Sequence, residues 1–197
     1  YPEKYVMGGV ANIAALIEEP GVIRHNGNMA SLIFGELDNS TSERAQLLFN
    51  SCQAANIKVE IPKDINLAIW EKYIRLVTMS AMTTLCRMPI GPIRNDTETR
   101  NLLVQILSEI IEVAKAKGLT FGENVVNDQL SIIDGYPPSM VASMCGDLRR
   151  GYRLEVPWFS GTVAKLGVSL NVPTPANAFV YKALKLFEDG KPEEAQT

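Results

Sequence analysis

The sequence predicts a mainly helical protein in which a helical domain follows a short α/β segment. In the C-terminal two thirds, apolar residues recur at helical spacing over long stretches. In the N-terminal third, short β-prone runs alternate with turn signals. The run Pro62-Lys63-Asp64 separates the two parts, so we predict one domain over 1–63 and a second over 64–197.

Turn signals divide the first 35 residues. Glu19-Pro20-Gly21 marks one turn, and the segments 22–25 and 31–35 have the composition of strands. Asn26-Gly27-Asn28 lies between these two segments and has the residue types of a tight hairpin turn. We therefore predict a β-hairpin that turns at Gly27.

A helix and a short strand are predicted next. Ser40, with Glu43 three residues later, has the pattern of a capping box and predicts a helix start. Asn56 predicts a left-handed helix end, and residues 58–61 predict a strand. These elements resemble the last part of a sheet whose beginning is absent, and the missing initiator Met indicates a fragment or a processed chain.

The second domain predicts successive helices. Asp64 can cap a helix over 65–84, and Gly118 ends a helix that Asn95 begins. Residues 88–92 predict a loop, and further helices are predicted over 124–133, 139–150, 154–166 and from 175 to about 189. We expect the core of this domain to contain Leu103, Ile106, Ile110, Leu166 and Val180.

Composition excludes several classes of protein. The 46% hydrophobic and 21% charged residues exclude disorder as the main state, and a net charge of −3 without basic runs argues against a nucleic-acid binder. One histidine and three separated cysteines argue against a zinc site and a disulfide framework. No apolar run reaches the ~20 residues of a membrane span, and no signal peptide is visible, so we expect a cytoplasmic protein.

Taken singly, no residue indicates catalysis. The sequence holds no GxGxxG, P-loop, GxSxG or HExxH motif. Read alone, Lys72 is a solvated helix lysine, Ser143 is an ordinary helix serine, and Glu155 is an acid favoured near a helix start.

Six short motifs follow one another in a fixed order: Gly8-Gly9-Val10 with Ala15; Ile33-Phe34-Gly35-Glu36; Trp70-Glu71-Lys72; Thr84 to Gly91; Ser143-Met144 with Asp147, Leu154-Glu155 and Gly161; and Gly167 with Val172-Pro173-Thr174-Pro175. Their order and spacing resemble the ketopantoate reductase family along essentially the whole chain. The resemblance implies a Rossmann domain that binds NADPH, followed by a helical domain like the C-terminal domain of 6-phosphogluconate dehydrogenase. Residues 1–63 would then be the end of the Rossmann domain, without its main phosphate-binding loop.

The resemblance also implies a role for particular residues. Lys72 matches the catalytic lysine, Ser143 a serine that binds the substrate carboxylate, and Ser80 a substrate-binding position. Glu155 and Ala15 match residues at the cofactor, and no metal is implied. Hydride transfer to a 2-oxo carbon places negative charge on the carbonyl oxygen, which an ammonium group can stabilise and then protonate.

Four positions depart from the family pattern. Leu76, Ser80, Ile90 and Met140 stand where the family often has asparagine. An amide that would hold polar groups of the substrate is lost at Leu76 and Ile90, and Ser80 replaces it only in part.

Three functions remain open at this point. The first is reduction of 2-dehydropantoate (ketopantoate) to pantoate in pantothenate biosynthesis, the second is the same fold acting on another small 2-oxoacid, and the third is a helical dimerisation module without activity. The apolar helix 96–117 and Trp158-Phe159 would suit an interface, and a homodimer is an open alternative. Lys72, Ser143 and Glu155 together favour an enzyme, although the fragment alone is expected to be inactive.

Overall fold

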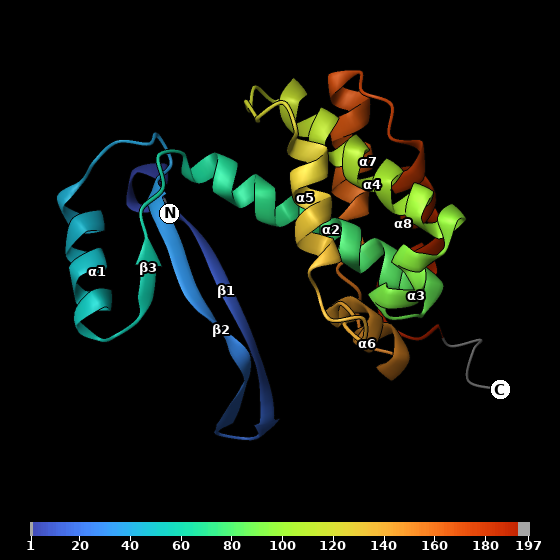
Figure 1. Cartoon of the computed structure of the whole chain (residues 1–197), viewed down its shortest axis with the longest axis horizontal. Coiled ribbons are helices and arrows are strands. Elements are labelled where there is room, and N and C mark those ends of the chain that lie inside the picture. Colours follow the sequence, from blue (N-terminus) through green and yellow to red (C-terminus); the bar gives the residue numbers. More distant parts are fainter. Residues whose placement is uncertain (1, 193–197) are drawn as a thin grey trace. The chain divides into compact units, whose positions relative to one another are not determined.

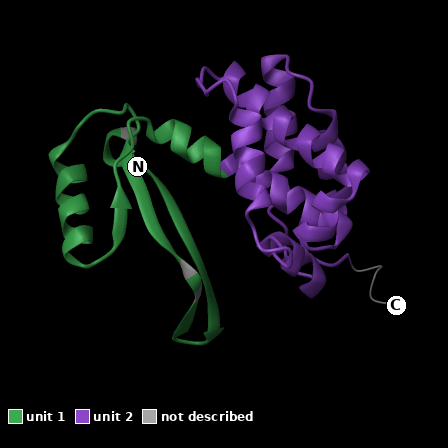
Figure 2. Ribbon diagram, viewed as in Figure 1, with its two compact units in different colours: residues 1–72 green, residues 73–197 purple. Residues whose placement is uncertain are grey.

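The computed structural model describes residues 2–192 and divides the chain into two compact units, residues 1–72 and 73–197 (Figures 1 and 2). The boundary falls within helix α2 (Ile65–Cys86). The first unit holds the strands and the second holds most of the helices. This confirms the predicted class, a mainly helical protein that begins with an α/β segment.

The first unit is a small sheet with one covering helix. After a 3-10 turn (Glu3–Tyr5) come β1 (Met7–Glu19), β2 (Val22–Glu36), α1 (Glu43–Ala54) and β3 (Lys58–Glu60). The strand order is β1-β2-β3, with β1 antiparallel and β3 parallel to β2. The parallel pair is joined through α1, because parallel strands need a crossover connection.

The predicted turn of the hairpin is wrong. β1 and β2 are joined at Pro20-Gly21, where Gly21 has φ +86°, as expected for the third residue of a type II turn after proline. The run Asn26-Gly27-Asn28 lies inside β2, where the pairing with β1 shifts its register. The Nε2 atom of His25 lies 3.0 Å from the carbonyl oxygen of Met29 across this irregularity.

Helix α1 begins two residues later than predicted, because Ser42 and not Ser40 is its N-cap. The Ser42 Oγ accepts a hydrogen bond from the amide of Ala45 at 3.1 Å and donates to Glu36 Oε1 at 2.5 Å. Arg44 Nε donates to the same oxygen at 2.6 Å. The bonds from Arg44 and then Ser42 lower the pKa of Glu36 to about 2. These contacts join the end of β2 to the start of α1.

The second unit is a bundle of short helices around α4. After the end of α2, this unit contains α3 (Ile90–Asn95), α4 (Thr97–Ala116), α5 (Val125–Asp134), α6 (Ser143–Arg150), α7 (Ser160–Leu170), α8 (Pro175–Leu184) and a final 3-10 turn (Lys185–Phe187). The predicted core residues Leu103, Ile106, Ile110 and Val180 are fully buried. Leu166 is only half-buried, because α7 turns Gly161, Val163 and Gly167 inward instead.

The observed helix ends agree best with the predicted ones where a single capping residue determines the end. The Asp64 carboxylate accepts from the amides of Asn66 at 2.9 Å and Leu67 at 3.0 Å, as predicted for the cap of α2. Gly118 ends α4 with φ +95°. The start of α4 differs by one residue, because Asp96 rather than Asn95 accepts from the Thr99 amide.

Three other boundaries differ more. The predicted loop over 88–92 already contains the start of α3, and the helices predicted from 139 and from 154 begin at Ser143 and Ser160. The amide of Leu154, for example, donates to the carbonyl of Glu188 at 3.1 Å. Its hydrogen bond is thus made with a distant segment rather than within a helix.

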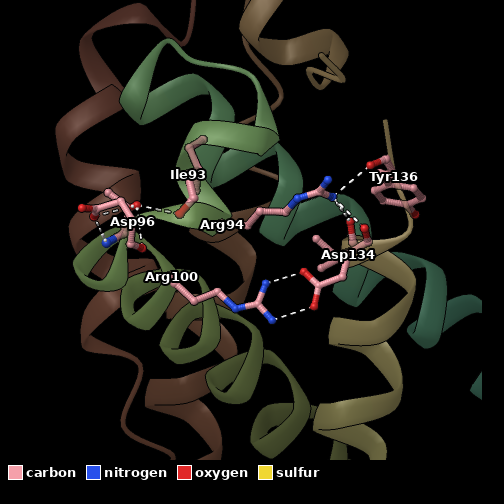
Figure 3. Close-up of polar contacts among 8 residues, drawn as sticks. Ile93, Arg94, Asp96, Arg100, Asp134 and Tyr136 are labelled. Carbon is pink, nitrogen blue, oxygen red and sulfur yellow. Dashed lines mark hydrogen bonds and ion pairs between the residues drawn. The ribbon is translucent and has the colours of Figure 1, made fainter. Parts of the chain in front are cut away.

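Two arginines close the C-terminal end of α5 (Figure 3). Arg94 Nη1 donates to the carbonyls of Asp134 at 2.8 Å and Tyr136 at 2.9 Å. Arg100 donates from both terminal guanidinium nitrogens to the two oxygens of the Asp134 carboxylate. These hydrogen bonds lower the pKa of Asp134. Cations at a helix C-terminus satisfy carbonyls that have no partner within the helix.

Candidate active site

Ser143 is the first residue of α6, and its side chain is exposed. The N-cap before it, Ala142, makes no side-chain hydrogen bond to the first amides of the helix. An exposed hydroxyl beside uncapped helix amides is an arrangement that suits a carboxylate. The position of Ser143 is therefore chemically compatible with the predicted role, which stays a prediction.

Thr83 of α2 fixes the start of α6. Its Oγ1 donates to the carbonyl of Met79 at 2.7 Å and accepts from the amide of Ala142 at 3.2 Å. The second bond holds the backbone one residue before Ser143. Sequence reasoning missed Thr83, because a threonine within a helix usually bonds only to the preceding turn.

Gly91 allows α3 to pack closely against the segment that leads into α6. The amides of Ile90 and Gly91 donate to the carbonyls of Met140 and Pro138, each at 2.9 Å. A Cβ at position 91 would lie 2.8 Å from the Pro138 Cβ and 2.9 Å from its carbonyl oxygen. Only glycine permits this approach. The sequence signal for it was the motif that ends in Gly91, although the motif did not reveal the contact.

Glu155 lies in the turn before α7. The amides of Trp158 and Phe159 donate to its carbonyl oxygen at 3.0 and 3.1 Å. Partial burial, and then the negative charge of Asp147, raise the pKa of the Glu155 carboxyl above its usual value. Asp147 lies one turn after Ser143 on α6. The structure thus brings the helix that carries Ser143 close to the turn that carries Glu155.

Tyr73 attaches α2 to this turn. Its hydroxyl lies 2.9 Å from the carbonyl oxygen of Trp158 and 3.1 Å from that of Phe159. Burial raises the pKa of Tyr73 to about 12, so the hydroxyl remains a donor at neutral pH. The sequence predicted Tyr73 only as an apolar position of the helix and gave no sign of this contact.

Ser80 is fully buried in the second unit. Its Oγ, like the Oγ1 of Thr84 one turn later, has no hydrogen-bond partner within residues 2–192. Leu76, one turn earlier, is 37% exposed. The structure therefore offers no exposed Ser80 hydroxyl, and a substrate contact by Ser80 stays an untested prediction.

Lys72 and Ala15 belong to the first unit. Lys72 Nζ donates to the carbonyl oxygen of Ala11 on β1 at 2.5 Å. Ala15 lies on the same strand, paired with His25 and exposed. Ala15 lies four positions after Ala11 along the strand, a span of about 13 Å. Lys72 thus contacts β1 and Ala15 is part of β1, but the two residues are not next to each other.

Two further properties bear on the chemistry. No cluster of three or more His, Cys, Asp or Glu side chains that could hold a metal ion occurs among the described residues. Across residues 2–192, no helix has both the length and the apolar character to cross a membrane.

Known proteins resemble this chain in sequence. The model of the family described as ketopantoate reductase PanE/ApbA C terminal matches residues 64–188. A 2-dehydropantoate 2-reductase of Archaeoglobus fulgidus is 23% identical over 185 residues, which cover 94% of this chain and 62% of that protein. The chain thus spans about three fifths of the length of this relative.

Solved structures resemble it in fold. A dimeric ketopantoate reductase from Staphylococcus aureus is 26% identical and has a TM-score of 0.80, with 93% of this chain and 62% of that chain covered. A D-mandelate dehydrogenase, solved with NADH and anilino(oxo)acetate, is 19% identical and has a TM-score of 0.83 over 95% of this chain and 61% of that chain. At that identity the likeness shows the fold alone. From the family match over 64–188, which is more than half of the chain, the chain belongs to the ketopantoate reductase family of oxidoreductases.

Proposed function

We propose that the full-length protein containing this chain is an NADPH-dependent reductase of small 2-oxoacids, with 2-dehydropantoate as substrate and pantoate as product. The observation that carries this proposal is that Lys72, Ser143 and Glu155 are all present in a chain of this family. Residues 1–63 would complete the nucleotide-binding domain and 64–197 would bind the substrate. A cytoplasmic location and a homodimer belong to the same proposal.

The residues present are compatible with a nicotinamide cofactor. Glu155 is a carboxylate that can accept hydrogen bonds from hydroxyl or amide groups, and the small exposed side chain of Ala15 leaves room on β1 for a bulky ligand. When bound, NADPH supplies the hydride. No glycine-rich phosphate loop occurs in this sequence, so we expect the chain alone to bind NADPH weakly.

Lys72 and Ser143 would act on the substrate. The Lys72 ammonium would donate to the 2-oxo oxygen and transfer a proton to it as negative charge develops there. Its bond to Ala11 holds this ammonium at β1. The Ser143 hydroxyl and the first amides of α6 would bind the carboxylate and so fix which carbon receives the hydride.

A second substrate is favoured by the apolar residues at two family positions that are at least partly exposed. Leu76 and Met140 cannot offer the amide donors and acceptors of asparagine, whereas Ile90 is fully buried. A 2-oxoacid with fewer hydroxyl groups than 2-dehydropantoate would leave fewer polar groups unpaired beside them. Comparison of kcat/KM for 2-dehydropantoate with that for 2-oxoacids bearing apolar side chains distinguishes the two proposals.

Replacing Ser143 by alanine in the full-length protein should mainly raise the KM for the 2-oxoacid. A hydrogen bond to a charged carboxylate is worth about 1.5–3 kcal/mol, so the KM should rise roughly 10- to 100-fold while the KM for NADPH stays the same. Ser169→Ala, on the exposed face of α7, is the matched control. Steady-state kinetics test this, and a KM for the 2-oxoacid within twofold of the parent would remove Ser143 from the substrate site.

A further inference from the structure

A cationic pocket of about 520 Å³ lies at the C-terminal end of α6. None of the residues assigned above to substrate or cofactor is among those that line it. Four of the side chains that line it are positively charged and two are aromatic: Arg87, Arg149, Arg150, Lys191, Tyr152 and Phe187.

Within the described residues 2–192, most of this positive charge has no carboxylate partner. Arg150 forms an ion pair with Asp147 at 2.7 Å. Among residues 2–192, Arg87, Arg149 and Lys191 have no carboxylate within ion-pair distance. Like charges that share a cavity repel one another, and a bound anion would remove that repulsion. Guanidinium groups in particular match the oxygen geometry of phosphate.

The backbone of Arg87 supplies a second observation. Arg87 directly follows the last residue of α2 and has φ +54°, in the left-handed region that costs an arginine free energy and glycine almost none. Arg149 Nη2 donates to the Arg87 carbonyl at 2.9 Å, which fastens this residue to α6. Backbone geometry alone would favour glycine at this position. Arg87 is one of the residues that line the pocket, and its side chain is what glycine would not provide.

The opposite wall of the pocket is held by backbone contacts. The amide of Lys191 donates to the carbonyl of Gly151 at 3.1 Å. Gly190 has φ +109°, and a Cβ there would lie 2.9 Å from the same carbonyl oxygen. Two glycines thus let the segment that carries Lys191 pack directly on the end of α6. These contacts hold the backbone of this wall in place without a ligand, which lowers the cost of binding.

From these contacts we infer that the pocket binds a small molecule that carries a phosphate group. Arg87, Arg149 and Lys191 bind the phosphate oxygens. Tyr152, whose side chain is exposed, and Phe187 contact the rest of the ligand. The volume exceeds what a lone phosphate fills and lies in the range of small-molecule sites. A nucleotide should therefore bind more tightly than inorganic phosphate.

Titration of the chain with inorganic phosphate, ADP and citrate, followed by amide chemical shifts, tests this inference. We expect phosphate and ADP to shift the amides of Gly151 and Lys191, with ADP binding more tightly. Arg87→Gly and Arg149→Ala should each weaken binding by about tenfold or more. Arg24→Ala, which removes an exposed arginine from the first unit, is the matched control and should leave binding unchanged.

Arg87→Gly separates binding from folding. Because glycine accepts the left-handed conformation, the Tm of this variant should stay the same or rise while binding is lost. If Arg149→Ala does not fold, Arg87→Gly alone decides. The inference is overturned if neither phosphate nor ADP binds at millimolar concentration, if citrate binds and they do not, or if Arg87→Gly binds ADP like the parent. In each of those cases the cations serve only the C-terminal end of α6.

Discussion

Replacing Lys72 by alanine in the full-length protein is expected to lower kcat by about 10²–10⁴-fold, the usual contribution of a positioned general acid. The affinity for NADPH should change little, because the proposed role of Lys72 is at the substrate carbonyl. Lys72→Arg keeps the positive charge but holds its proton too tightly to transfer it. It should therefore also lose most of kcat.

Single-turnover and steady-state kinetics measure this effect. Lys165→Ala, on the exposed surface of α7, removes the same charge elsewhere and should leave kcat unchanged. If Lys72→Ala reduces kcat less than twofold on every 2-oxoacid that the parent reduces, Lys72 is a surface lysine and the proposed mechanism fails.

The second large effect concerns the stability of the helical unit. Glu109 of α4 is 7% exposed and accepts hydrogen bonds from the amides of Ala176 at 2.8 Å and Asn177 at 2.9 Å. It also accepts from Asn177 Nδ2 at 2.8 Å. Thr174, the N-cap of α8, provides no side-chain bond, so a carboxylate from another helix caps α8.

Glu109→Ala should lower the free energy of unfolding by about 2–4 kcal/mol, because the buried amides of α8 lose their acceptor. Glu109→Gln keeps one acceptor oxygen, so its free energy of unfolding should lie between those of the parent and of Glu109→Ala. Glu112→Ala, on the same helix but exposed and paired with Lys115, should change stability by less than about 1 kcal/mol. Urea unfolding measures all three, and equal effects for Glu109→Ala and Glu112→Ala would contradict this capping role.

The sequence was most informative where one residue determines the local backbone. Asp64 caps α2, Asn56 has φ +60° at the end of α1, and Gly118 has φ +95° after α4, each as predicted. These features depend on the residue itself and its nearest neighbours. Burial of Ile106 was also predictable, because the apolar residues of α4 recur with a helical period.

Errors arose where several local signals compete. Pro20-Gly21 and Asn26-Gly27-Asn28 both favour a turn, and only the pairing of β1 with β2 decides which one closes the hairpin. Ser40 and Ser42 are both good caps, and the bond from Ser42 to Glu36 selects the second. Such choices depend on residues that are distant in the sequence.

In the candidate site, too, the residues found from the sequence differ from those that were missed. Lys72, Ser143 and Glu155 were chosen through the family motifs, and each lies on or beside a predicted helix. Thr83 and Tyr73 were missed, since their hydroxyls bond to backbone that is 59 and 85 residues away. No local pattern reports such contacts, although they hold the starts of α6 and α7 in place.

The most direct test is the consumption of NADPH by the full-length protein when 2-dehydropantoate is added, followed by absorbance and by identification of the product. We predict that NADPH is oxidised in step with substrate and that pantoate forms. If NADPH is oxidised only with a different small 2-oxoacid, the proposed reductase activity stands and the proposed substrate is wrong. If NADPH is consumed with neither 2-dehydropantoate nor a panel of small 2-oxoacids, the proposal that this chain belongs to a 2-oxoacid reductase is contradicted.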